Sequence, residues 1–130
     1  MLTRMFVGMV VISLLMPLVM IDSPSDYRVG LNQIYGAVFM SAAMILISGH
    51  TSDPVILLGM FLVSVLCILG IRYQVGVSET QYLRDMIPHH SMAVLTSKKQ
   101  VARQGPVQPL ARAILDTQVK EIALMKSMLV

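Results

Sequence analysis

The first half of the chain consists of three long apolar stretches joined by short polar links. The stretches cover residues 5–21, 31–49 and 55–71, and none of them contains a charged side chain. An α-helix rises about 1.5 Å per residue, so helices of this length approach the thickness of a bilayer core, about 30 Å. The pattern therefore predicts three transmembrane helices.

The second half follows a different pattern, in which apolar residues recur at helical spacing. Ser78 and Gln81 match the capping-box pattern, which predicts a helix over residues 79–103. A Gly-Pro pair ends this helix, and Pro109 suits the first turn of a second helix over residues 109–129. The pattern therefore predicts an amphipathic helical hairpin.

No strand pattern appears in the sequence, so the predicted fold class is all-α. We expect two domains: residues 1–75 form a membrane anchor with three transmembrane helices, and residues 76–130 form the helical hairpin. Within the anchor, Asp53 suits the N-cap of a helix and Pro54 its first position. The short link before them predicts that the second and third apolar helices run antiparallel.

The composition agrees with a membrane anchor. Hydrophobic residues make up 55% of the chain and charged residues 13%, and the mean hydropathy is +0.73, which is too apolar for an ordinary soluble domain. Nucleic-acid-binding surfaces combine basic and stacking aromatic residues, but this chain has no Trp and few other aromatics, so no nucleic-acid partner is expected. Cys67 is the single cysteine and cannot form an intrachain disulfide.

The candidate chemistry is concentrated in residues 86–92, which read Met-Ile-Pro-His-His-Ser-Met. Imidazole nitrogen and thioether sulfur together form the ligand set that suits Cu(I) or Ag(I). At 100° per residue the first helix of the hairpin has one face that the amphipathic pattern predicts to be buried. That face contains Tyr82, Met86, His89, His90, Ala93 and Ser97.

Folding the hairpin about Pro106 brings the second helix beside this motif. His90 lies sixteen residues before the turn, so in an antiparallel pair it is level with Glu121 and Met125. We therefore predict a metal site that holds a copper or silver ion. Its ligands would be Met86, His89, His90, Met92, Glu121 and Met125.

The same residues also have a purely structural interpretation. A carboxylate such as Glu121 can orient His90 by a hydrogen bond without any metal. In that case the hairpin dimerises or docks on a partner protein, and the histidines are satisfied core groups. Enzymatic activity is not expected, because neither the Glu-x-x-His pair of di-iron proteins nor the His-Glu-x-x-His motif of zinc proteases occurs.

The hairpin carries two motifs, YLRDMIPHHSMA at residues 82–93 and QVKEIALM at residues 118–125. Together they resemble the DUF305 family over about residues 78–130, and the apolar half is similar to that of its membrane-anchored members. The resemblance implies a ferritin-like helical hairpin or bundle, and some relatives are associated with copper binding and with copper or silver tolerance. By this resemblance, the signature positions of the family correspond to Met86, His89, His90, Gln118, Glu121 and Met125 in this sequence.

Two helices of this length bury little core, so we expect the hairpin to pair with a second copy or with the membrane helices. A homodimer would form a four-helix bundle and bring two His-Met patches into one core. The association of relatives with metal tolerance also implies a metal-handling partner protein.

Three spans place the two termini on opposite sides of the membrane. Arg28, Arg72 and Arg84 favour a cytoplasmic hairpin under the positive-inside rule, whereas Arg4 argues for the reverse. The resemblance to DUF305 implies a hairpin outside the cytoplasm. We expect a multi-pass inner-membrane protein with a periplasmic C-terminal domain.

Overall fold

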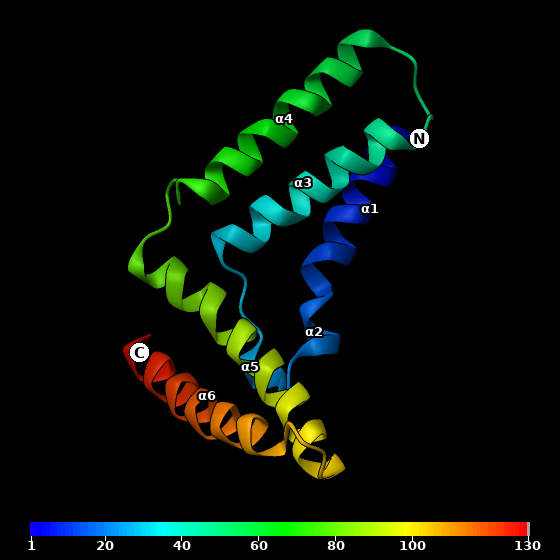
Figure 1. Ribbon diagram of the computed structural model, residues 1–130. Coiled ribbons are helices and arrows are strands. Elements are labelled where there is room, and N and C mark those ends of the chain that lie inside the picture. Colours follow the sequence, from blue (N-terminus) through cyan, green and yellow to red (C-terminus); the bar gives the residue numbers. More distant parts are fainter. Residues whose placement is uncertain (130) are drawn as a thin grey trace. The chain divides into compact units, whose positions relative to one another are not determined.

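The computed structural model describes residues 1–129, and every regular element in this part of the chain is helical (Figure 1). The prediction of an all-α fold is therefore confirmed. In chain order the elements are α1 (Leu2–Leu15), α2 (Pro17–Met20), the 3₁₀ helix η1 (Pro24–Asp26), α3 (Leu31–Ile47), α4 (Pro54–Arg72), α5 (Glu79–Arg103) and α6 (Gln108–Met128).

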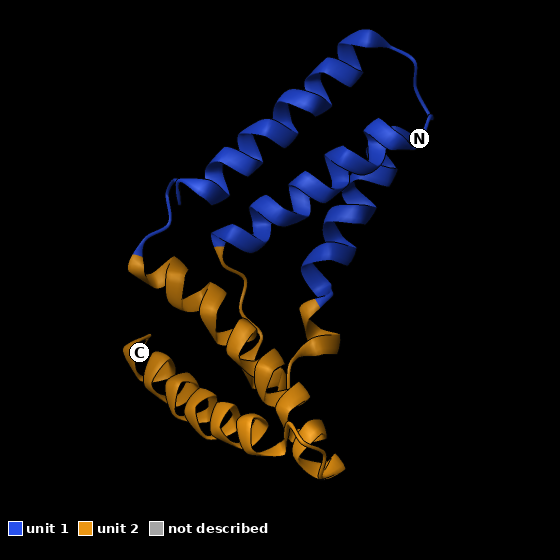
Figure 2. Cartoon of the chain, viewed as in Figure 1, with its two compact units in different colours: residues 1–16, 31–78 blue, residues 17–30, 79–130 orange. Residues whose placement is uncertain are grey.

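The chain divides into two compact units (Figure 2). Unit 1 contains residues 1–16 and 31–78, which carry α1, α3 and α4. Unit 2 contains the α5/α6 hairpin together with residues 17–30. Residues 17–30 lie within the anchor expected at residues 1–75, but in the structure they pack with the hairpin.

In unit 1, helix α3 packs against both α1 and α4. Its buried side chains include Ala37, Ser41 and Ala42, and such small residues let helices approach closely. The hydroxyl of Ser41 donates to the carbonyl of Ala37 at 2.7 Å, so this buried polar group is satisfied within the helix. The sequence of α3 therefore makes it the central helix of the unit.

Helix α4 begins as its sequence predicts. The carboxylate of Asp53 accepts a hydrogen bond from the backbone N–H of Val55 at 2.9 Å, and Pro54 occupies the first position. At the other end, the hydroxyl of Tyr35 donates to the carbonyl of Val75 at 2.8 Å. These bonds hold the start of α4 and the chain that follows its end.

By length and composition, two helical segments could cross a membrane, Leu2–Met20 and Pro54–Arg72, each of 19 residues. The sequence predicts three transmembrane helices, and this number is corrected to two candidates by helix length, because α3 has only 17 residues. The apolar sequence continues to Gly49, but the helix ends at Ile47 and Gly49 adopts a positive φ of 66°. A glycine in this conformation ends the run before it reaches full spanning length.

In unit 2, α5 and α6 form the hairpin with the expected boundaries. Its core consists of four buried side chains, Ile87, Val94, Ile122 and Met125. Partly buried side chains surround this core: Leu83, Met86, Leu115 and Leu129. This packing sets the alignment of the two helices and so determines which polar side chains meet across them.

Candidate functional site

His90 uses both of its ring nitrogens within the hairpin. Its Nδ1 atom lies 2.9 Å from the carbonyl oxygen of Met86, and its Nε2 atom lies 2.9 Å from Oε2 of Glu121. The amide of Gln118 also donates to that Glu121 oxygen, at 3.3 Å. Glu121 therefore lies beside His90, as the antiparallel alignment predicts.

These partners constrain the protons on His90. A carbonyl oxygen can only accept, so the Nδ1 atom must carry a hydrogen. The bond between Nε2 and Glu121 then needs one further proton, carried either by the imidazole or by the carboxyl group. A metal ion at Nε2 would have to replace that proton, so the observed arrangement satisfies His90 without a metal.

The structure separates the other predicted ligands. Met86 is half-buried against the core and Met125 is part of that core, so both lie near His90 and Glu121. His89 is exposed, and Met92 is half-buried about 120° around the helix from Met86. No group of three or more His, Cys, Asp or Glu side chains suited to a metal occurs within residues 1–129.

The buried surface of α5 differs from the predicted one. Tyr82 is 52% exposed and His89 is exposed, although both belong to the face expected to be inside. The buried side chains are Asp85, Ile87, Pro88, Ser91, Val94 and Ser97, of which Ser97 alone was expected on the buried face. The reason is that α5 has two partners in unit 2, α6 and the segment of residues 17–30, so its buried arc is wider and rotated.

A polar cluster fastens residues 17–30 to the hairpin. The hydroxyl of Ser91 donates to Oδ2 of Asp26 at 2.6 Å and accepts from the backbone N–H of Asp22 at 2.9 Å. Lys126 donates to the other carboxylate oxygen of Asp26, and Lys98 pairs with the carboxylate of Asp22 at 2.6 Å. Both helices of the hairpin therefore hold the segment.

The local sequence explains how Asp26 reaches this position. The hydroxyl of Ser23 accepts from the backbone N–H of Ser25 at 3.3 Å and starts the 3₁₀ turn η1. Arg28 closes the turn by donating to the carbonyls of Ser25 and Tyr27 at 2.9 and 2.7 Å. Asp26 is thereby held at 5% exposure.

Burial alone would raise the pKa of Asp26, because it disfavours the charged carboxylate. The hydrogen bonds from Lys126 and Ser91, together with the charge of Lys126, outweigh this effect and hold the pKa below its ordinary value of 3.8. At neutral pH the group is an ion-paired carboxylate.

Residues 22–30 have the sequence of a simple polar turn, so the sequence-based prediction missed this cluster. Two signals were available: a short link that contains two aspartates, and a second polar stripe on α5 that contains Ser91 and Lys98. These positions lie on one side of a helix. A polar stripe on an amphipathic helix usually faces water, which is why it did not indicate a partner.

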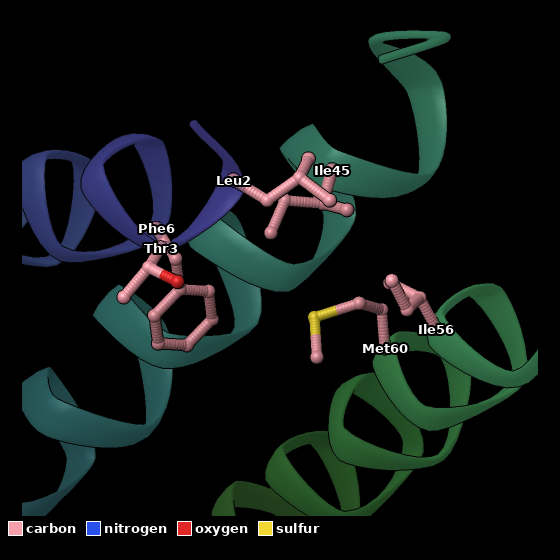
Figure 3. Close-up of a pocket in the computed structure, with 6 residues that line it drawn as sticks. All are labelled: Leu2, Thr3, Phe6, Ile45, Ile56 and Met60. Carbon is pink, nitrogen blue, oxygen red and sulfur yellow. The ribbon is translucent and has the colours of Figure 1, made fainter. Parts of the chain in front are cut away.

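Unit 1 contains an apolar cavity of about 360 Å³ (Figure 3). Its lining comes from α1, α3 and α4 and consists of Leu2, Thr3, Phe6, Ile45, Ile56 and Met60. These six side chains include one hydroxyl group and no titratable group. The cavity can hold an apolar group but offers no acid, base or metal ligand.

The helical hairpin matches a family model described as "Domain of unknown function (DUF305)" over residues 71–129. An uncharacterized protein of Acanthamoeba polyphaga mimivirus is 34% identical over 118 residues, which cover 83% of this chain and 76% of the viral protein. The chain belongs to the DUF305 family. The likeness of this DUF305 chain to the viral protein extends well beyond residues 71–129, into the apolar half. No solved structure matches the chain.

Proposed function

We propose that this DUF305 protein is a membrane-anchored interaction module whose hairpin pairs with a second copy of itself. The observation that carries the proposal is a face of the hairpin formed by exposed and half-buried side chains, which we call the open face. On α5 it consists of Tyr82, Met86, His89, Ala93 and Thr96, and on α6 of Leu110, Ile114, Thr117, Glu121, Leu124 and Met128. Both sets alternate steps of four and three residues, the spacing of helix-packing seams.

The two ends of the open face are strongly apolar. Leu110 is 63% exposed at one end, and Met128 and Tyr82 are 59% and 52% exposed at the other. Each end also has a shallow groove, lined in part by Leu110 and Ile114 at one end and by Tyr82 and Met128 at the other. Contiguous exposed apolar surface of this kind marks an interaction site.

A second copy is the partner that this pattern favours. The open face has apolar ends and a polar centre formed by His89 and Glu121. A two-fold rotation about that centre lays apolar ends on apolar ends and the polar centre on itself. The product is a four-helix bundle, which gives each hairpin the core that two helices alone cannot supply.

The oligomeric state of matched variants tests the pairing. Leu124 and Val119 are exposed apolar residues of α6, at 56% and 49%, but Val119 lies outside the open face. We expect Leu124→Lys to convert a detergent-solubilised dimer to a monomer and Val119→Lys to leave the dimer intact, as measured by light scattering after gel filtration. A monomeric parent protein, or equal dissociation of both variants, contradicts the proposal.

The proposal adds α3 as a third membrane crossing to the two segments that are long enough by themselves. Asp22 and Asp26 bond to Ser91 and Lys126 of the hairpin, so residues 22–30 and the hairpin lie on the same side of any membrane. The chain between Gly30 and Glu79 must then cross an even number of times. With α4 as one crossing, α3 is the other, and its 17 residues span about 25 Å, which a bilayer can accommodate by local thinning.

Thiol labelling of intact cells tests this topology, in a Cys67→Ser background. We expect Ser25→Cys and Ser127→Cys to react from the same side and Thr51→Cys from the opposite side. Labelling of Ser25→Cys and Thr51→Cys from one side contradicts three crossings. The side on which Ser127→Cys reacts distinguishes the cytoplasmic hairpin favoured by Arg28, Arg72 and Arg84 from the periplasmic one favoured by the family resemblance.

A second candidate function is Cu(I) or Ag(I) binding at the paired open faces. The observation that favours it is that Met86 and His89 lie one helical turn apart on the open face, and His89 is exposed. Two copies would supply two imidazoles and two thioethers, with a metal-handling protein as the donor. Met92 and Met125 lie off this face and do not join the set.

Anaerobic Cu(I) titration of the full chain tests the second candidate. We expect His89→Ala to abolish binding and His50→Ala, which removes another exposed histidine, to leave it unchanged. Equal affinity of the two variants and the parent contradicts a site at His89.

A further inference from the structure

Unit 2 contains a cavity of about 280 Å³ with a strongly basic lining. The cavity is formed by the segment before α3, the first turns of α5 and the last turn of α6. Its lining residues are Arg28, Val29, Thr80, Arg84, Lys126 and Leu129. Three of these six side chains are cations, and a fourth carries a hydroxyl group.

The positive charge of this cavity is only partly compensated. Lys126 pairs with Asp26, and Arg28 uses Nη1 to donate to two backbone carbonyls, which orients its guanidinium group. Arg84 makes no ion pair with any residue that the structure describes. The lining itself contains three cations and no carboxylate. The neighbouring carboxylates are Asp26, which pairs with Lys126, the buried Asp85, and Glu79 in the first turn of α5.

We propose that this cavity binds a phosphate group, supplied by the headgroup of an anionic phospholipid. The planar guanidinium groups of Arg28 and Arg84 match phosphate oxygens by paired N–H bonds. The hydroxyl of Thr80 adds a donor at the start of α5, where the helix dipole also favours an anion. The site goes beyond the pairing of hairpins, since none of its cations belongs to the open face.

The position of the cavity along the chain explains the choice of a lipid. Arg28 lies three residues before α3, so its Cα atom is within about 10 Å of that of Leu31. Thr80 follows the end of α4 by eight residues. Basic side chains next to membrane helices attract anionic headgroups. This part of the inference rests on the proposed membrane anchoring, whereas the phosphate chemistry does not.

Lipid and phosphate binding by the full chain in non-ionic detergent tests the inference. Phosphatidylglycerol and phosphatidylcholine are titrated by native mass spectrometry, and inorganic phosphate by calorimetry. Arg84→Gln removes a cavity cation, Arg84→Lys retains the charge, and Arg112→Gln removes another exposed arginine, on α6 and outside the cavity. Because Arg84 is exposed and unpaired among the described residues, its replacement does not threaten folding.

We expect phosphatidylglycerol to bind more tightly than phosphatidylcholine. Arg84→Gln should weaken its binding about ten-fold or more, Arg84→Lys less, and Arg112→Gln by less than about two-fold. Inorganic phosphate that binds with this variant pattern while the lipid does not would overturn the lipid assignment and keep the phosphate site. Equal effects of Arg84→Gln and Arg112→Gln would overturn the site itself. If the protein is monomeric but binds lipid with this variant pattern, the phosphate site is supported and only the pairing proposal fails.

Discussion

The hydroxyl of Ser91 lies 2.6 Å from Oδ2 of Asp26 and joins two parts of the chain that are 65 residues apart. Ser91 is completely buried, and it also accepts the backbone N–H of Asp22 at 2.9 Å. One small side chain thus satisfies a carboxylate and a backbone amide of the same segment. This relationship makes residues 17–30 part of the hairpin unit rather than a loose link between apolar helices.

Replacement of Asp26 by asparagine should release this segment. The new amide side chain would be similar in size and would keep an acceptor for Ser91, but it would lose the charge that pairs with Lys126. A hydrogen bond between charged groups in a largely buried setting contributes roughly 1–3 kcal/mol, so we expect at least a ten-fold drop in protection of the Asp22 amide. Hydrogen exchange followed by mass spectrometry of residues 17–30 measures this drop.

The neighbouring ion pair supplies the control for that experiment. Lys98 and Asp22 are more exposed, with side-chain exposures of 52% and 22%, and exposed pairs contribute about 1 kcal/mol or less. Asp22→Asn should therefore leave the protection of the segment nearly unchanged. If both variants exchange alike, Asp26 is not the group that holds the segment.

Acid should detach the segment through the same carboxylate. The pKa of Asp26 is lower in the folded protein than its ordinary value of 3.8, so folding favours the ionised form. The resulting stabilisation is complete above the ordinary pKa and is lost as the pH falls through the lowered value. We expect protection of residues 17–30, corrected for intrinsic exchange, to be constant from neutral pH to about pH 5 and to fall below about pH 4. In Asp26→Asn this fall should be absent; an identical acid profile in the variant would assign it to another group.

Gly30 should tolerate no side chain. A Cβ atom at this position would lie 2.1 Å from Oδ1 of Asp85, which is buried in α5. Overpacking of this kind costs about 1–3 kcal/mol, so Gly30→Ala should loosen the segment by hydrogen exchange. Gly105→Ala is the matched control, because a Cβ atom there meets nothing within 4 Å.

The cause of the Gly30 effect can be checked by a second change. Asp85→Ala removes all three atoms that the new Cβ would meet. The double variant should therefore be less perturbed than the sum of its single variants, by a coupling of about 0.5–3 kcal/mol, as is usual for contacting residues. Strict additivity would show that the glycine is needed for another reason.

Local signals in the sequence predict most of the helices. Asp53 and Pro54 begin α4, and the Gly105-Pro106 pair separates α5 from α6, because these residue types have strong backbone preferences. The pairing of His90 with Glu121 also follows, since the short turn sets the alignment of an antiparallel hairpin. These features depend on residues that are close in sequence or joined by a short turn.

The contact between Asp26 and Ser91 could not be predicted in this way. It joins a polar link to the middle of a distant helix, and neither residue lies in a periodic apolar pattern that would indicate burial. The exposure of His89 was missed for the same reason, because the buried arc of α5 depends on a partner that the hairpin pattern does not contain. Helical periodicity identifies a polar face but not what covers it.

Crosslinking in native membranes is the most direct test of the central claim, that the hairpin pairs through its open face. Single cysteines are introduced as Leu124→Cys and, for comparison, Val119→Cys, each in a Cys67→Ser background and treated with a short bifunctional thiol reagent. We expect a covalent dimer with Leu124→Cys and only monomer with Val119→Cys. A dimer with Val119→Cys alone, or monomer with both, would contradict pairing through the open face.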